Sequence, residues 1–164
     1  MFRKFLLKLT PFFNLFFNGK FVQGFNLTFI EPKNITIGNG VIFEKNCFLN
    51  AYQGKIVIGE KSAMNYSTFI SAGFGEIFIS KNVLIGPQVS IRSSNHSLDR
   101  TKRHVHNPGK IIIEENVWIG ANATILPNVV IGKNSIIGAG SVVTKSIPSN
   151  CIAIGNPCKV IKKQ

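Results

Sequence analysis

All three histidines of the chain, and its only aspartate, fall in one segment, residues 92–110. A neutral imidazole accepts a proton from a hydroxyl or an amine near pH 7, so a histidine here could act as a general base. Three imidazoles could instead hold zinc: His104 and His106 are two residues apart, on one side of a strand, and His96 could complete the site. Asp99 could shape the segment or contact a substrate. The segment therefore allows two chemistries, proton abstraction and metal binding.

The rest of the composition excludes other kinds of site. One Asp and six Glu among 164 residues leave little material for a two-carboxylate glycosidase site or an EF-hand. Three cysteines without a CxxC pair support neither a disulfide framework nor a zinc ribbon, and they suit a reducing compartment. Cys47 and Cys158 occupy repeat and tail positions, which indicates packing. No uninterrupted apolar run reaches about 18 residues and no signal-peptide cleavage site occurs, so neither feature is predicted.

The charge of the chain is strongly positive. It has 19 Lys and Arg against 7 Asp and Glu, a net charge of +12. This favours anionic partners such as nucleic acid, a phosphorylated cofactor or an anionic membrane. The basic residues are spread from Arg3 to Lys163, and no recognition motif with interleaved aromatic residues occurs. We therefore expect no nucleic-acid partner.

The elements that must position residues 92–110 follow a six-residue repeat. An aliphatic residue recurs every six positions, often followed by Gly, and a small or β-branched residue stands four positions after it. A period of six does not fit an α-helix. The longest unbroken run is Ile113, Ile119, Ile125, Ile131, Ile137 and Val143.

These hexads group in threes, which predicts a triangular coil with short strands as sides and Gly or Asn at the corners. The groups begin at residues 37, 58, 79, 113, 131 and 149. We expect the aliphatic residues to point inward and to stack on their equivalents one coil away. The first two steps are longer because of corner insertions near 53–54 and 73–75, and the third contains residues 92–110.

Residues 113–162 resemble the hexapeptide-repeat acyltransferases, in particular the galactoside, maltose and serine acetyltransferase branch and its polysaccharide O-acetyltransferase relatives. The resemblance extends over residues 35–162, and its motifs are specific from residue 95 onward. It implies an all-β fold, a left-handed parallel β-helix that is a single-stranded solenoid. It also implies a homotrimer with active sites between neighbouring subunits.

The resemblance assigns roles to single residues. Residues 95–99 are similar to the family's loop segment with the catalytic His, although Ser97 replaces a Pro, and this makes His96 the general base. The acceptor would attack the acetyl-CoA thioester directly, without an acyl-enzyme. Asn65 resembles an acceptor-binding Asn of the family, and Trp118 resembles the family's Trp near the acetyl group. Asp99 is expected to shape the loop or to contact the substrate. His104 and His106 are expected to serve loop structure or acceptor contacts. The family's zinc-binding carbonic anhydrases take their three His from separate coils, not from one loop.

The resemblance to the hexapeptide-repeat acyltransferases also implies which residues bind CoA. The phosphates of CoA require basic residues at one end of the groove. Lys159 and Lys162 replace residues that are often Arg, which retains the charge and loses the bidentate fork. The full set implied to bind acetyl-CoA is Ala121, Ala139, Thr144, Lys145, Lys159 and Lys162. No metal is expected in this interpretation.

Residues 1–30 do not share the repeat. They contain nine of the 14 Phe, and Phe2, Phe5, Leu6 and Leu9 have helical spacing that ends at Pro11. We expect a short helical cap over the first coil, or a basic amphipathic anchor formed by residues 1–17. We expect residues 31–164 to form the β-helix, with one long loop at 92–110 and a tail at 155–164.

The sequence thus predicts an acetyl-CoA-dependent O-acetyltransferase that modifies a sugar hydroxyl, in surface polysaccharide or glycolipid assembly. It would work in the cytoplasm or at the inner face of the cytoplasmic membrane, bound peripherally through residues 1–17. Three alternatives stay open: a serine acetyltransferase-like enzyme, a three-His zinc β-helix like the carbonic anhydrases, and a structural β-helix without catalysis. The first lacks support because the long helical N-terminal domain of that enzyme is missing.

Overall fold

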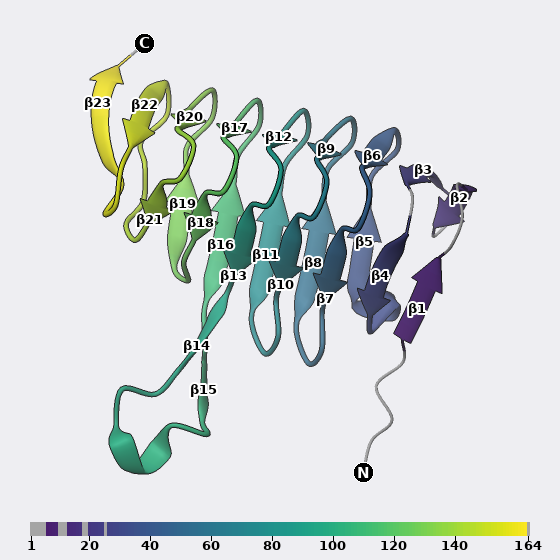
Figure 1. Cartoon of the computed structure of the whole chain (residues 1–164), viewed down its shortest axis with the longest axis horizontal. Helices are drawn as coiled ribbons and strands as arrows, with labels where there is room; N and C mark the ends of the chain where they lie inside the picture. Colours follow the sequence, from purple (N-terminus) through teal and green to yellow (C-terminus); the bar gives the residue numbers. More distant parts are fainter. Residues whose placement is uncertain (1–5, 10–12, 18–19, 25, 164) are drawn as a thin grey trace.

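The chain winds into a parallel β-helix whose coils stack along one axis (Figure 1). Its three sheets give it a triangular cross-section. This computed structural model describes the backbone of residues 6–9, 13–17, 20–24 and 26–163, and the side chains of residues 26–163. Each coil contributes one strand to each of three flat sheets, which we call sheets A, B and C. The chain passes from sheet C to sheet B, then to sheet A, and returns to sheet C.

The strands of each sheet lie side by side in the order of the coils. Sheet A contains β1 (Leu6–Leu9), β4 (Leu27–Ile30), β7 (Phe48–Asn50), β10 (Phe69–Ser71), β13 (Ser90–Arg92), β18 (Thr124–Ile125) and β21 (Val142–Val143). Sheet B contains β2 (Phe13–Phe17), β3 (Lys20–Gly24), β6 (Val41–Phe43), β9 (Ala63–Met64), β12 (Leu84–Ile85), β17 (Trp118–Ile119), β20 (Ile136–Ile137), β22 (Cys151–Ile154) and β23 (Lys159–Lys163). Sheet C contains β5 (Ile35–Ile37), β8 (Lys55–Ile58), β11 (Glu76–Ile79), β16 (Lys110–Ile113) and β19 (Val129–Ile131).

One excursion leaves the prism. Between β13 and β16 the chain forms a two-stranded antiparallel hairpin, β14 (Ser94–His96) and β15 (His106–Pro108), with the 3₁₀ turn η2 (Arg100–Lys102) at its tip. Figure 1 shows this hairpin projecting away from the stack of coils. A second 3₁₀ turn, η1 (Pro32–Asn34), lies between β4 and β5. In the described ranges no helix is long and apolar enough to cross a membrane.

The predicted inward ladder is confirmed. In sheet C, the parallel register pairs Ile37 with Ile58 and Ile79 with Ile113. These side chains and their equivalents in the next coils are at most 2% exposed. Because the residue four positions after each aliphatic lies where the sheets converge, it is buried too, as at Ala123 and Ser135. The buried Ser135 hydroxyl donates to the Pro148 carbonyl at 2.7 Å, so its burial leaves no unmet hydrogen bond.

The corners are turned by residues in the left-handed backbone region. Non-glycine residues there are mostly Asn, which tolerates this conformation better than most side chains do. Asn116, Asn134 and Asn150 stack along one corner, and their side-chain amides hydrogen-bond at 3.2 and 2.9 Å. The two expected corner insertions are turns whose central residues, Gln53 and Phe74, also have positive φ.

The expected N-terminal helix is wrong for the described residues. Leu6–Leu9 form β1, which pairs antiparallel with β4, and β2 and β3 form a hairpin that continues parallel onto β6. The first coil of a solenoid exposes a row of unpaired backbone groups, and strand pairing satisfies them where a helix could not. This tertiary demand outweighs the helical spacing of the apolar residues. Phe2 and Phe5 lie outside the described residues.

Candidate active site

The loop that carries the histidines leaves the prism at one edge, where the chain passes from sheet A to sheet C. We call this edge the A/C corner, and the edge between sheets B and A the B/A corner. The loop is fastened at its root, where the Gly109 amide donates to the Ser93 carbonyl at 2.6 Å. The hairpin register then places Asn95 opposite Asn107 and His96 opposite His106.

His96 is exposed and lies next to a short aromatic row. Its ring centroid is 4.7 Å from that of His106, which stacks on Phe74 at 4.2 Å with an interplanar angle of 17°. Phe74 in turn meets Tyr52 edge to face at 5.7 Å. The corner turns of two earlier coils thus support the hairpin strand opposite His96, so that side chains from four points in the sequence meet there.

Two cavities flank His96, and both are lined by it and by Asn95. The first cavity, of about 380 Å³, lies toward the earlier coils, among the corner turns and the ends of the sheet A strands. The second cavity, of about 590 Å³, lies toward the later coils and reaches Pro127 and Asn128. His96 therefore stands where two ligands could approach each other from opposite sides.

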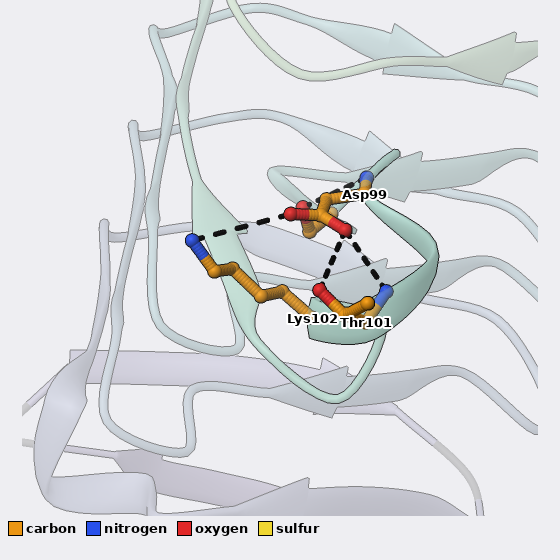
Figure 2. Close-up of polar contacts among 4 residues, drawn as sticks. Asp99, Thr101 and Lys102 are labelled. Atoms are coloured by element: carbon orange, nitrogen blue, oxygen red, sulfur yellow. Dashed lines mark hydrogen bonds and ion pairs between the residues drawn. The ribbon is translucent and has the colours of Figure 1, made fainter.

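Asp99 is bound within its own turn (Figure 2). One carboxylate oxygen accepts from the backbone amide of Thr101 at 2.9 Å and from its hydroxyl at 2.8 Å, and the other lies 4.0 Å from Nζ of Lys102. The hydrogen bonds from Thr101, the backbone one first, lower the pKa of Asp99 below its ordinary value. Asp99 thus caps η2, and neither cavity beside His96 has it in its lining.

His104 does not join the other two histidines. It lies exposed in the bend before β15, while His96 and His106 face each other across the hairpin. Among the residues that the structure describes, no group of three His, Cys, Asp or Glu side chains is arranged to hold a metal ion.

The cysteines are packing residues, as expected. Cys47, Cys151 and Cys158 are buried and unpaired. Burial raises the pKa of Cys47 to about 11, and burial likewise raises the pKa of Cys158. The thiols of Cys47 and Cys158 therefore stay protonated near neutral pH and are poor nucleophiles.

Asn65 and Trp118 come together, but not with His96. Both line a third cavity of about 330 Å³ along sheet B, where Leu84 lies between them in the strand order. Trp118 is 53% exposed, and the Asn65 side-chain oxygen accepts from the Tyr66 amide at 2.9 Å. This cavity lies toward the B/A corner of the prism, whereas His96 projects from the A/C corner.

The residues implied to bind CoA also divide between the corners. Ala121 and Ala139 follow β17 and β20 at the B/A corner, one coil apart. Thr144 and Lys145 follow β21 at the A/C corner, one coil beyond the second cavity. Lys159 and Lys162 lie on the terminal strand β23, opposite Ile154 and Ile152 of β22. Thr144 and the three lysines are all exposed.

Several lining residues of the first cavity were missed by sequence reasoning. They include Asn50 and Ser71, whose side chains hydrogen-bond at 3.4 Å, and Arg92 at the end of β13. The longer corner at 73–75 was visible in the repeat, but it gave no sign that Phe74 would support the histidines.

Comparison with known proteins places this chain in a family. Residues 110–145 match the bacterial transferase hexapeptide family (six repeats). The galactoside O-acetyltransferase of Lactococcus lactis is 42% identical over 133 residues, which are 73% of this chain and 61% of that protein. The chain thus spans about three fifths of that relative's length.

Solved structures of acyltransferases are also similar to this chain. A maltose O-acetyltransferase from Clostridium difficile is 38% identical, with a TM-score of 0.74 over 80% of this chain and 71% of that one. A variant of AntD, an N-acyltransferase from Bacillus cereus in complex with dTDP-4-amino-4,6-dideoxyglucose and coenzyme A, is 27% identical, with a TM-score of 0.78 over 87% of this chain and 80% of that one. The fold is the left-handed parallel β-helix. The chain belongs to the hexapeptide-repeat acyltransferase family.

Proposed function

We propose that the protein is an acetyl-CoA-dependent O-acetyltransferase that modifies a sugar hydroxyl, with His96 as general base. The observation that carries this proposal is the position of His96 between the first and second cavities, which could hold an acceptor and a donor on its two sides. A neutral imidazole with an exposed ring can accept the proton of a hydroxyl bound beside it.

In this mechanism the acetyl group passes from sulfur to oxygen in two steps. The acceptor oxygen attacks the thioester carbonyl as His96 takes the hydroxyl proton. The carbon–sulfur bond then breaks, and the CoA sulfur leaves with the proton from the imidazolium. The products are an acetyl ester and free CoA. No cysteine takes part, because all three thiols are buried.

The kinds of ligand are supported by the relatives. Those named above are a galactoside and a maltose O-acetyltransferase and an N-acyltransferase that was solved with CoA and a nucleotide sugar. For the donor, we assign the pantetheine arm to the backbone at Ala121 and Ala139, and the phosphates to Thr144, Lys145 and the lysines of β23.

The separation of the two residue groups supports a trimer. Asn65 and Trp118 lie toward the B/A corner, while His96 projects from the A/C corner of the same chain. We assign Asn65 and Trp118 to the acceptor and the acetyl group in a site shared between subunits, where the B/A corner of one faces the A/C corner of its neighbour. The exposed indole of Trp118 would become covered in that arrangement.

We also propose that the acceptor belongs to surface polysaccharide or glycolipid assembly in the cytoplasm. The net charge of +12 and the basic residues Arg3, Lys4 and Lys8 support docking on an anionic membrane. Liposome flotation tests this: binding should require anionic lipid and should disappear when residues 1–17 are deleted. A full chain that never floats would end the membrane proposal.

The catalytic assignment is tested by His96→Ala, with His104→Ala as the matched control. We expect His96→Ala to lower the turnover of acetyl-CoA with a sugar acceptor by about 10²–10⁴, measured as release of free CoA, because it removes the base. His104→Ala should keep most of the turnover. If His96→Ala retains more than a tenth of the wild-type turnover, His96 is not the base. Loss of bound zinc in His96→Ala, His104→Ala and His106→Ala alike would favour the three-histidine zinc alternative.

A further inference from the structure

Arg92 gives the first cavity a charge that the proposed reaction does not use. It is the last residue of β13, and among the residues that line this cavity it alone carries a permanent charge. The lining contains no Asp or Glu; its polar groups are amides, hydroxyls and the two imidazoles of His96 and His106.

The guanidinium of Arg92 is held in place by its own sheet. Its central carbon lies 4.6 Å from the centroid of the Phe69 ring, and its Nε donates to the Ser90 hydroxyl oxygen at 3.2 Å. Phe69 is itself stacked on Phe48 at 5.0 Å, with ring planes 4° apart. Such stacking fixes the plane of the guanidinium before any ligand arrives.

Arg92 has no anionic partner in the described part of the chain. The ion pairs found there join Lys33 to Glu31, Lys81 to Glu115, Lys102 to Asp99 and Lys110 to Glu76. An exposed guanidinium that is oriented, unpaired and open to a cavity is suited to a carboxylate or a phosphate, which it can bind through two parallel hydrogen bonds.

We propose that the acceptor is an anionic sugar, and that Arg92 binds its carboxylate or phosphate in the first cavity while His96 acts on a hydroxyl of the same molecule. This inference rests on the proposed function and specifies its acceptor. The cavity, at about 380 Å³, falls in the range of small-molecule sites. Because Arg92 and His96 line the same cavity, one sugar can contact both.

The test compares three acceptors with one ring: galactose, galacturonate and galactose 1-phosphate. Turnover is followed as release of CoA from acetyl-CoA. We expect kcat/KM for at least one of the anionic sugars to exceed that for galactose by about tenfold or more, and the better of the two identifies the anion. Equal values for all three acceptors would overturn the proposal.

Arg92→Gln removes the guanidinium, and Arg100→Gln removes the same charge from η2, outside the cavities beside His96. We expect Arg92→Gln to lower kcat/KM at least tenfold more for the preferred anionic sugar than for galactose, and Arg100→Gln to leave the preference intact. Arg92→Lys should recover only part of the loss, because it lacks the fork. If Arg92→Gln affects all acceptors alike and also dissociates the oligomer in sedimentation, Arg92 is a subunit contact and the proposal is wrong.

Failure of the proposed function gives a different result. If the wild-type protein releases CoA with none of the three sugars, calorimetric titration with galacturonate and galactose 1-phosphate still tests Arg92. Binding that Arg92→Gln weakens by about tenfold or more would support the anion site without the reaction. Binding that is absent, or unchanged by Arg92→Gln, would contradict the site.

Discussion

Asp99 lies three residues after His96, but its carboxylate is already occupied by the turn that it caps. Both Thr101 donors bind one of its oxygens, and the carboxylate itself is not in the lining of either cavity beside His96. The family resemblance allows two roles for Asp99, a contact that shapes the loop or a contact to the substrate. The geometry favours an indirect role, in which Asp99 holds the tip of the loop and thereby the hairpin strand that carries His96.

Two substitutions of Asp99 separate these roles. Asn can accept the same hydrogen bonds at the start of a helical turn, whereas Ala cannot. We expect Asp99→Asn to keep turnover within about twofold of the wild type, and Asp99→Ala to lower it by less than about tenfold through a looser loop. Steady-state CoA release measures both. If Asp99→Asn loses as much turnover as His96→Ala, the charge of Asp99 takes part in the reaction.

At the scale of elements, the loop depends on a close contact at its root. A Cβ at Gly75 would lie 2.5 Å from the Gly109 carbonyl oxygen and 2.6 Å from the Ser93 hydroxyl, so the corner turn and the loop root touch backbone to backbone. At Gly73, two residues earlier, the nearest atom would be 3.8 Å away. The corner insertion and the loop are thus one packed unit.

Gly75→Ala should therefore disturb the loop, and Gly73→Ala should not. Overpacking of this kind costs about 1–3 kcal/mol. We expect the free energy of unfolding of Gly75→Ala to fall by about that amount, with faster amide exchange over residues 94–108, and that of Gly73→Ala to change by less than about 0.5 kcal/mol. Denaturant unfolding and hydrogen exchange make the comparison. Equal effects of the two variants would show that the root contact is not what holds the loop.

The terminal hairpin of β22 and β23 brings Lys159 and Lys162 to the edge of sheet B. If these residues bind the phosphates of CoA, Lys159→Ala combined with Lys162→Ala should raise the KM for acetyl-CoA by about tenfold, because two cations are lost. The rise should shrink as salt increases, since salt screens exposed charges. Lys133→Ala is the control, because this exposed lysine lies between β19 and β20, outside β23. An unchanged KM in the double variant would remove β23 from the cofactor site.

At the scale of the molecule, the sequence predicts whether a side chain points into the prism, because this depends on the position of the residue along its coil. A period of six determines which residues point inward, so the inward positions of Ile113 and Ala123 follow from the sequence alone. The N-terminal strands could not be, because their pairing is set by the open edge of the first coil. The contacts of Phe74 with His106 and of Arg92 with Phe69 were missed for a related reason: they join residues from different coils or outward-facing side chains, which the repeat does not specify.

The whole-molecule arrangement decides where the site is completed. Within one chain, His96 and the pair Asn65 and Trp118 lie at different corners, so a site that uses all three requires a neighbour. A variant with His96→Ala keeps its B/A corner intact, and a variant with Asn65→Ala and Trp118→Ala keeps its A/C corner intact. Each variant alone should be nearly inactive. Each should still be a trimer, with a mass in sedimentation three times that of one chain.

Mixing the two variants by co-expression, and purifying trimers that carry both tags, tests the shared site. Every trimer that carries both tags has three neighbouring pairs, and one of the three joins the two intact halves in the right order, so we expect about a third of the wild-type turnover. The control is a mixture of two differently tagged His96→Ala chains, which should stay inactive. A site contained within a single chain would give no recovery in either mixture, because every chain then carries one defect. That result, or a monomer in sedimentation, would contradict the shared site.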